Sequence, residues 1–430
     1  MKKVLPVLAV VLIFVLGLGI MLYPAIANYV NARSQTVAID HYEEAAQANA
    51  AYYEGLLEQA QAFNGEIFEN GGLVNLTDAL SAPGALDLLR HTPASYLGSC
   101  RFKLPPVGEG EDVYRALFDV MRRYDIGYFF YVGGNDSMDT ILKLSDYAAK
   151  IGSGIRFMGV PKTIDNDLMI TDHTPGYGSA AKYIGMTIKE LVRDSTIYDL
   201  KSVTVVEIMG RNAGWLTAAA ALAEDEDCEG AAMICLPEIP FDPDHFLSRV
   251  AELQKKTPSL VIAVSEGIRA ADGRYVCELA DSNLVVDPFG HKYLGGTARY
   301  LASLIGAKLG CKTRAVELST LQRCAAHAAS MTDVSESFAV GEAAALAALA
   351  GKTGMMAALK RVSDAPYLCT TELHDIHDIA NLEKTVPLSY IDAENYRLRE
   401  PFFAYARPLI ESEVEPEYIR GLPRHLTLPR

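Results

Sequence analysis

The sequence has no cluster of basic residues, although it is long enough for two or three globular units. Its 430 residues carry 39 Lys and Arg against 54 Asp and Glu, which gives a formal net charge of −15. Nucleic-acid binding depends largely on neutralising phosphates, so this composition argues against a nucleic acid as partner. An acidic chain can still bind a small anion where a few cations converge in one cleft.

The sequence also lacks any Cys-x-x-Cys pair, and its seven cysteines are scattered and odd in number. This pattern argues against a disulfide framework and a structural zinc site, and it favours a reducing compartment. Most of these cysteines are expected to be small buried hydrophobic residues. They are Cys100, Cys228, Cys235, Cys277, Cys311, Cys324 and Cys369.

One long hydrophobic run stands apart from this picture. Residues 4–29 carry no charge, and a helix of about 20 apolar residues can cross the core of a bilayer. A cleaved secretory signal is the alternative, with Ala-Ile-Ala at 25–27 as its cleavage site. Lysines precede the run and only Arg33 follows closely. The positive-inside rule therefore predicts that the rest of the chain lies on the outer side of the membrane.

The residues after this run extend the predicted anchor. Residues 37–63 are rich in Ala, Glu, Gln and Tyr and contain no Pro, which predicts an amphipathic helix. The segment YPAIANYVNARSQTVAIDHYEEAA (23–46) resembles the membrane-proximal start of a class C sortase. Residues 1–64 are therefore expected to form a transmembrane helix and a membrane-proximal helix.

From about residue 65 the pattern changes to alternating strands and helices. Short apolar runs separated by helical stretches predict an α/β fold, with parallel sheets covered on both faces. The predicted strands span residues 126–132, 155–160, 203–209, 231–236 and 260–264.

The first motif that carries chemistry is Gly133-Gly134-Asn135-Asp136-Ser137, between a predicted strand and a predicted helix. Glycines let a ligand approach the backbone, and a helix start offers free N–H groups and a partial positive charge to an anion. A polyphosphate fits this site. The alternative is a glycine-rich turn without a ligand, and the motif alone does not decide between the two.

The second motif, Pro161-Lys162-Thr163-Ile164-Asp165-Asn166-Asp167, directly follows the strand predicted at 155–160. The carboxyl ends of strands are where open α/β sheets bind ligands. There, one Asp can accept a hydroxyl proton while Lys162 neutralises a transferring phosphate. An Asp- and Asn-rich turn that caps a helix is the alternative, which the preceding glycine motif disfavours.

These motifs, with five further segments, resemble the phosphofructokinase family. The further segments are LGSCRFK (97–103), Met209-Gly210-Arg211 with Gly214-Trp215, Ser265-Glu266-Gly267, FGHKYLGG (289–296) and RAVELSTLQR (314–323). The resemblance implies two Rossmann-like three-layer domains within residues 65–430, with the active site between them. The first is expected over about 65–172 plus returning C-terminal segments, and the second over about 173–322.

The resemblance also implies a role for each site residue. Asp165 is expected to be the general base that deprotonates the sugar 1-hydroxyl, with Asp167 supporting it. The donor phosphates are expected to contact Arg101, Gly133, Gly134, Asp136, Ser137, Lys162 and Thr163. Fructose 6-phosphate is expected to contact Met209, Gly210, Arg211, Glu266, Arg314 and Arg323. Asn135 and Asp136 are the expected residues for Mg²⁺, and Asn135 replaces an aspartate of many relatives.

Two positions indicate the phosphoryl donor. ATP-using members have glycine where this chain has Asp136, whose carboxylate would crowd and repel an α-phosphate. Many of them also have glycine at the position of Lys162, and a lysine suits compact pyrophosphate. The resemblance therefore implies transfer from pyrophosphate to fructose 6-phosphate, giving fructose 1,6-bisphosphate. An ATP-dependent enzyme is the alternative.

One family motif is absent from the sequence. The family opens with a strand and a Gly-Gly-x-x-Pro-Gly-x-Asn loop that cradles phosphate, and no such motif precedes Arg101. A first domain truncated at its N-terminus is thus expected to expose a sheet edge. A membrane-tethered remnant that binds sugar phosphate without catalysis remains a second alternative. Family members form homodimers or homotetramers in the cytoplasm, an expectation that conflicts with the predicted membrane anchor.

Overall fold

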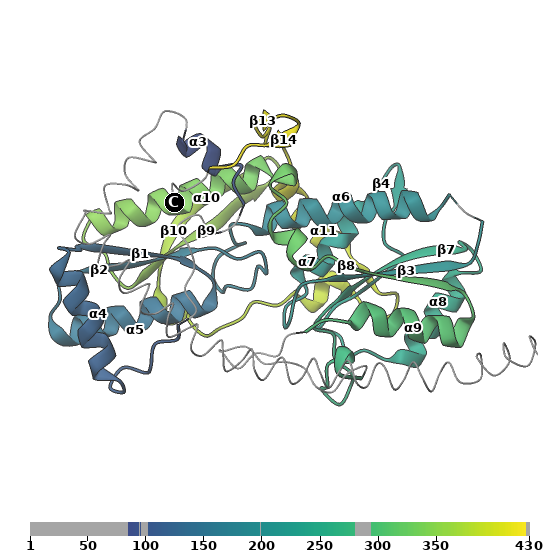
Figure 1. Cartoon of the computed structure of the whole chain (residues 1–430), viewed down its shortest axis with the longest axis horizontal. Coiled ribbons are helices and arrows are strands. Elements are labelled where there is room, and N and C mark those ends of the chain that lie inside the picture. The colour runs from purple at the N-terminus through teal and green to yellow at the C-terminus, as the bar shows by residue number, and fades with distance from the viewer. Residues whose placement is uncertain (1–84, 94, 96–101, 198, 280–293, 427–430) are drawn as a thin grey trace, which may run out of the picture. The chain divides into compact units, whose positions relative to one another are not determined.

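The computed structural model describes residues 85–93, 95, 102–197, 199–279 and 294–426. Residues 84–427 form one compact unit, and Figure 1 shows two sheets in it, each lying between layers of helices. The strands of the two sheets are β1 (Tyr128–Gly133), β2 (Arg156–Pro161), β3 (Ser202–Ile208), β6 (Met233–Cys235), β7 (Ser259–Ser265), β8 (Lys312–Glu317), β9 (Met355–Asp364) and β10 (Tyr367–Asp375). The α-helices are α3 (Ala85–Leu89), α4 (Glu111–Arg123), α5 (Asn135–Ile151), α6 (Tyr177–Ser195), α7 (Trp215–Ala218), α8 (Pro243–Leu253), α9 (Thr297–Leu309), α10 (Met331–Leu349) and α11 (Glu400–Ala406).

Short elements complete the described part of the chain. Three two-stranded ribbons are β4 (Glu224–Asp225) with β5 (Cys228–Glu229), β11 (Ile391–Asp392) with β12 (Arg397–Leu398), and β13 (Tyr418–Ile419) with β14 (Leu422–Pro423). The 3₁₀ turns are η1 (Ala219–Ala223), η2 (Val276–Leu279), η3 (Ser319–Arg323), η4 (Ala326–Ala328), η5 (Ile376–Asp378), η6 (Leu388–Tyr390) and η7 (Arg407–Ile410).

The first sheet joins strands from both ends of the described chain, in the order β1-β2-β9-β10. β1, β2 and β9 run parallel, and β10 returns antiparallel to β9. Helix α10 covers one face, and α4 and α5 cover the other (Figure 1). β2 is buried on both faces because helices lie above and below it. Phe118, Ile141 and Phe157 are fully buried on the α4–α5 side, and each contributes about 1.5–3 kcal/mol by its burial.

β1 forms one edge of the first sheet within the described residues. Its alternate side chains Tyr128, Phe130 and Val132 are 48%, 40% and 54% exposed. An apolar strand of this kind is typical of a sheet that continues further, because an open apolar edge invites pairing.

The second sheet has the order β6-β7-β3-β8, and all of its neighbouring strands are parallel. Every residue of β7 is buried, as are Val203–Ile208 of β3, because α6 lies on one face and α8 and α9 lie on the other (Figure 1). Two cores result, one on each face, and both are built mainly from Val, Ile, Leu and Ala side chains. Burial on both faces accounts for the continuous apolar runs of these strands.

The strands predicted from the apolar runs are confirmed as β1, β2, β3, β6 and β7. The six described cysteines are free thiols. Only Cys235 and Cys277 are buried, so the expectation that most cysteines are buried is wrong for the described residues. No described helix is long and apolar enough to cross a membrane. The predicted membrane span and the helix at 37–63 lie outside the described residues.

Candidate active site

The glycine motif forms the junction between β1 and α5. A Cβ atom on Gly133 would lie 2.0 Å from Ser137 Oγ, so only glycine fits there. Gly134 is the N-cap of α5 and makes no side-chain cap. Within the described residues, the N–H groups of Asn135 and Asp136 have no protein acceptor, as is usual in the first helical turn. The helix therefore presents donors and a partial positive charge at the carboxyl end of β1.

The second motif follows β2 and lies beside the first. The Lys162 N–H donates to Gly133 O (3.0 Å), which places the exposed Lys162 side chain next to the start of α5. Thr163 supports Asp165: its hydroxyl donates to Asp165 Oδ2 and accepts from the Asp165 N–H, both at 3.1 Å. Asp165 Oδ1 has no hydrogen-bond partner in the described part of the chain. One carboxylate oxygen is thus fixed and the other is available to a substrate hydroxyl.

The two aspartates of this loop bind protons more tightly than ordinary carboxylates. Burial raises the pKa of Asp165, while the nearby Thr163, Lys162 and Arg211 partly oppose the rise. Burial, together with the negative charges of Asp165 and Glu383, raises the pKa of Asp167 to about 7. Groups with such pKa values are suited to proton transfer near neutral pH.

The segment after β3 meets the end of β7 at the same edge of the second sheet. Gly210 has φ 139°, and a Cβ atom on it would lie 2.7 Å from Ala213 O. Ser265 Oγ donates to Gly210 O (2.5 Å), and the Gly210 N–H donates to Glu266 Oε1 (3.4 Å). Burial raises the pKa of Glu266 to about 7. Gly210, with Met209 before it in the chain, is thereby held against Glu266, and their sugar-binding role stays a prediction.

A cavity of about 360 Å³ joins this site to α10. It is lined by Lys162 and by Arg323, which comes from the turn after β8. Buried Gln322 beside Arg323 accepts from the Met209 N–H (3.3 Å). With Arg90, which also lines it, three cations from distant parts of the sequence therefore line one cavity, an arrangement that can hold phosphate groups.

Arg314 lies apart from this cluster in the described chain. It is on the edge strand β8, and its Nη1 is 4.0 Å from Asp194 Oδ2 near the C-terminal end of α6. The opposite end of α6 begins beside Thr163, which bridges to Gly176. Since 19 helical residues span about 28 Å, Arg314 and the Asp165 loop lie at opposite ends of α6.

Three other predicted site residues need comment. Arg101 lies outside the described residues. The Thr163 hydroxyl donates to Asp165 Oδ2, so its proton is not available to a donor phosphate in this arrangement. Asn135 Nδ2 donates to Leu382 O (2.7 Å), and its Oδ1 accepts from the Asn381 N–H (3.0 Å), so its amide is used in protein contacts. The prediction that Asn135 binds Mg²⁺ therefore has no support in these contacts.

Sequence reasoning missed Glu383 and Lys384. Asn212 Nδ2 donates to both Glu383 carboxylate oxygens at 3.1 Å, and the Glu383 charge raises the pKa of Asp165 and Asp167. The Lys384 N–H donates to Asp167 O (2.7 Å). Their signal in the sequence is an acidic–basic pair in a polar segment, which has no distinctive spacing.

Glu383→Gln is expected to move the acid limb of the pH profile of kcat/KM to lower pH. A negative charge raises a neighbouring carboxyl pKa, so its removal lowers the pKa of Asp165 and Asp167, and the base ionises earlier as pH rises. The measurement is kcat/KM from pH 5 to 9, compared with wild type so that the titration of the sugar phosphate cancels. Glu229→Gln is the control, and an unmoved limb in Glu383→Gln would contradict the assignment.

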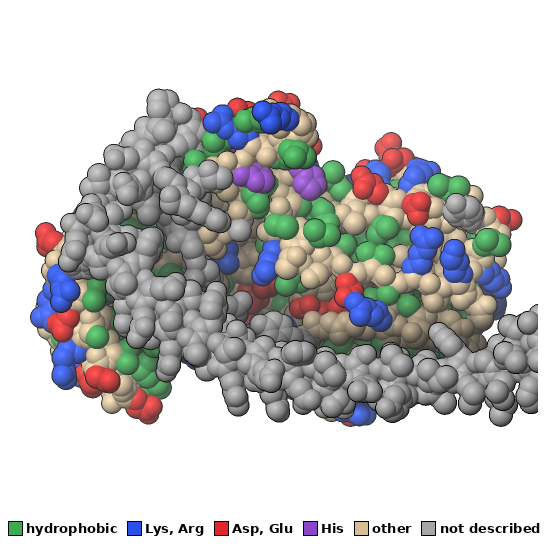
Figure 2. Space-filling model, viewed as in Figure 1, with side chains coloured by type: hydrophobic (Ala, Val, Ile, Leu, Met, Phe, Trp, Pro, Cys, Tyr) green, Lys and Arg blue, Asp and Glu red, His purple; other side chains and the backbone are tan. Residues whose placement is uncertain are grey.

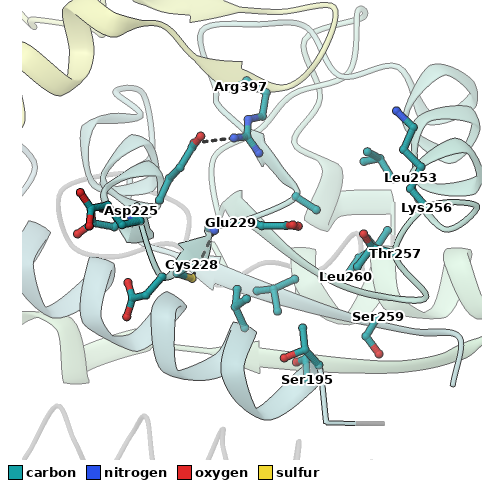
Figure 3. Close-up of a pocket in the computed structure, with 18 residues that line it drawn as sticks. Ser195, Asp225, Cys228, Glu229, Leu253, Lys256, Thr257, Ser259, Leu260 and Arg397 are labelled. Carbon is teal, nitrogen blue, oxygen red and sulfur yellow. Dashed lines mark hydrogen bonds and ion pairs between the residues drawn. The ribbon is translucent and has the colours of Figure 1, made fainter. Parts of the chain in front are cut away.

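A larger cavity lies elsewhere, around the β4–β5 ribbon. Arg397 Nη2 donates to Glu224 Oε2 (2.6 Å), and Figure 3 shows Arg397, Asp225 and Glu229 among the residues that line this cavity. The cavity measures about 720 Å³, and none of the predicted site residues lines it. Its carboxylates outnumber Lys256 and Arg397, so it is a poor site for a polyphosphate.

The fold and site together define an α/β phosphoryl-transfer protein. A helix N-terminus and a lysine face the carboxyl ends of the first sheet, paired aspartates follow them, and a sugar-type segment ends the second sheet. Figure 2 shows acidic and basic side chains together at the hollow in the middle of one face. Such sites act by positioning and charge neutralisation.

Comparison with known proteins gives the family. Residues 36–347 match the model of the phosphofructokinase family. The chain is 43% identical over 386 residues to the pyrophosphate--fructose 6-phosphate 1-phosphotransferase of Methylococcus capsulatus, covering 87% of this chain and 91% of that protein. It is 44% identical over 342 residues to the protein of the same name from Halomonas elongata, covering 79% and 81%. The chain therefore belongs to the phosphofructokinase family and resembles its pyrophosphate-dependent type.

A solved structure supports the same conclusion. The pyrophosphate-dependent phosphofructokinase of Marinobacter aquaeolei has a TM-score of 0.71 and 38% identity, covering 81% of this chain and 82% of that one. The expected phosphofructokinase fold is thereby confirmed. The family match begins at residue 36, inside the segment predicted as a membrane anchor, and the sortase resemblance receives no support from these comparisons.

Proposed function

We propose that the chain transfers a phosphoryl group from pyrophosphate to the 1-hydroxyl of fructose 6-phosphate, giving fructose 1,6-bisphosphate. The observation that carries this proposal is the junction of the α5 N-terminus and Lys162 with Asp165, in a chain whose relatives are named for this reaction. These groups supply an anion site and a base at one sheet edge.

In the proposed mechanism Asp165 acts as the general base. Thr163 holds Oδ2, which leaves Oδ1 to accept the proton of the sugar 1-hydroxyl as that oxygen attacks phosphorus. The bridging P–O bond of pyrophosphate breaks, and orthophosphate leaves. The α5 N-terminus and Lys162 bind the donor phosphates and neutralise charge on the phosphoryl group. Met209, Gly210, Arg211 and Glu266 hold the sugar, and Arg323 holds its 6-phosphate.

Mg²⁺ fits the charge distribution of this site. The Glu383 charge raises the pKa of both Asp165 and Asp167, and the Asp165 charge raises that of Asp167. Mg²⁺ is usually held by one or two carboxylates and the substrate phosphates. Among the described residues no three metal-type side chains converge on one point. Asp136 at the start of α5 would hold the ion together with the substrate phosphates, and the ion would neutralise part of their charge.

We also infer a role for Arg314 across a subunit contact. Its place at the far end of α6 separates it from the Asp165 loop of the same chain, while the family resemblance assigns it to the sugar 6-phosphate. The separation within one chain and the role in sugar-phosphate binding are compatible if Arg314 of one copy reaches the site of a second copy. We therefore expect a homodimer or homotetramer.

The test is an assay of the full-length chain in detergent, with Mg²⁺, fructose 6-phosphate and either pyrophosphate or ATP. Turnover with pyrophosphate alone is expected, from a particle whose mass by light scattering exceeds one chain. Turnover with ATP alone would overturn the donor assignment. Folded protein without turnover would favour a sugar-phosphate-binding remnant, as the exposed β1 edge allows.

A truncated chain separates catalysis from anchoring. A variant without residues 2–35 keeps the whole family match and is expected to retain turnover. The predicted anchor directs the full-length chain, and not this variant, to the membrane fraction. Equal partitioning of both chains would contradict the anchor and leave the catalytic proposal untouched.

A further inference from the structure

A short segment between β10 and η6 contacts three loops of the candidate site. This segment, the strap, comprises residues 381–386 with the sequence Asn-Leu-Glu-Lys-Thr-Val. It lies more than 200 residues after the glycine motif and the Asp165 loop in the sequence. Its contacts go to the donor-side loop, the catalytic loop and the sugar-side segment in turn.

The strap first holds the donor-side loop. Both polar atoms of the Asn135 amide bond to its backbone, at Leu382 O and Asn381 N. Asn381 has a positive φ of 65°, and its Nδ2 donates to Asp139 Oδ1 in α5 (3.1 Å). The start of α5 is therefore fixed by the strap rather than by a cap of its own.

The strap next holds the catalytic loop, mainly through Lys384. Its backbone N–H donates to Asp167 O (2.7 Å), and Leu168 and Glu383 form an antiparallel bridge. The buried ammonium donates to Asn166 Oδ1 (3.3 Å), Thr171 O (3.1 Å) and Asp172 O (2.8 Å). Three acceptors on one loop match the three donors of an ammonium group.

The strap finally holds the sugar-side segment. Trp215 Nε1 donates to Lys384 O (2.9 Å), and the Lys384 ammonium lies 5.3 Å from the centre of the Trp215 ring. Glu238 Oε1 accepts from both Gly214 N (2.8 Å) and Val386 N (2.9 Å). The segment that carries Arg211 is thus fixed to the same six residues as Asp165.

We propose that Lys384 is a positioning residue of phosphoryl transfer, which holds the Asp165 loop in register with the donor-side and sugar-side loops. A buried charge is costly and adds little to stability compared with an apolar group. The Lys384 ammonium instead contributes to the geometry of the site, because it holds Asn166, the neighbour of the base, together with residues 171 and 172. A displacement of about 1 Å at a reacting group can reduce the rate by about 10²-fold.

The inference rests on the proposed function and is tested with Lys384→Met in the full chain. Met keeps the length of the side chain and removes all three donors. We expect kcat to fall by about 10²-fold, with KM for both substrates and the calorimetric affinity for fructose 6-phosphate changed only a few-fold. Trp215→Phe removes the bond to Lys384 O and also shrinks the buried ring beside the Lys384 ammonium. It should again lower kcat more than substrate affinity, by a smaller factor than Lys384→Met.

Lys182→Met is the matched control, because Lys182 is also largely buried and donates to a backbone carbonyl, Ser412 O (2.8 Å), away from these loops. It is expected to keep kcat. Equal kcat in Lys384→Met and wild type, or a parallel loss of kcat and substrate affinity, would overturn the proposal.

A second readout does not depend on turnover. Hydrogen–deuterium exchange of the peptide spanning residues 163–176 is expected to accelerate in Lys384→Met and not in Lys182→Met. If wild type lacks activity but this difference in exchange appears, the proposed function is wrong, while the inference that Lys384 holds the Asp165 loop in place is still supported. If wild type is active and exchange is unchanged, the strap proposal fails alone.

Discussion

Asp165→Asn is expected to lower kcat by about 10²–10⁴-fold, the usual contribution of a positioned general base. Asn has the same size and can still accept the hydrogen bond of the Thr163 hydroxyl, so the loop should keep its shape. It cannot accept the proton of the sugar 1-hydroxyl. Steady-state assays with pyrophosphate give kcat, and calorimetry gives the affinity for fructose 6-phosphate, which should change only a few-fold.

The control for this variant is Asp119→Asn, an exposed aspartate on α4 that pairs with Arg122. It should leave both quantities unchanged. If Asp165→Asn instead weakened fructose 6-phosphate binding as much as it slowed turnover, Asp165 would be a sugar ligand. The general base would then have to be sought elsewhere, with Asp167 as the next carboxylate.

The pH dependence of wild type carries further information about Asp165. Burial raises its pKa, so the carboxylate is protonated over a wider acidic range than an exposed aspartate. A base must be ionised to act, and kcat/KM should therefore rise with pH through this raised pKa. Glu383→Gln moves the rise to lower pH, whereas Asp165→Asn should abolish its contribution.

The sequence predicts the sheets well because their signal is local. β2, β3 and β7 lie between helices, so a continuous apolar run is enough to identify each. The glycine and aspartate motifs are also local, because each directly follows its strand. Parallel strands then place both motifs at one edge of the sheet without further information.

The strap could not be predicted from the sequence for the opposite reason. Lys384 meets Asn166, Thr171 and Asp172 only after β9 and β10 have returned to the first sheet. Nothing in the sequence of residues 381–386 indicates which loop they contact. The Asn135 amide illustrates the same limit, because the sequence does not indicate its two backbone partners, Leu382 O and Asn381 N.

The separation of Arg314 from Asp165 has a similar origin. The motif around residues 314–323 is continuous in sequence, but β8 carries Arg314 near its start and the turn after β8 carries Arg323. Because each strand residue adds about 3.3 Å, the two arginines lie at opposite ends of the strand. Two residues of one short motif can thus lie at two separate sites, and only the fold shows that Arg314 and Arg323 are apart.

Lys162→Gly is expected to reduce kcat/KM for pyrophosphate by about 10²–10³-fold, as is typical when one stabilising group is removed from a site of charge transfer. The side chain leaves the backbone beside Gly133 and the start of α5, where two compact phosphates can reach it. Pairing it with Asp136→Gly should raise the ratio of kcat/KM for ATP to kcat/KM for pyrophosphate above that of wild type. Asp136 is exposed in the first turn of α5, close to where a third phosphate would extend.

Coulomb repulsion gives the expected scale of the Asp136 effect. Two unit charges 4 Å apart repel by about 1 kcal/mol in water and about 4 kcal/mol at an effective dielectric constant of 20. The range corresponds to about 5-fold to 10³-fold in ATP use, which steady-state assays with each donor can measure. Lys256→Gly, in the cavity near Arg397, is the control and should leave the donor preference unchanged. A double variant that still uses only pyrophosphate would show that other residues exclude the nucleotide, since neither the charge nor the bulk at these two positions would then matter.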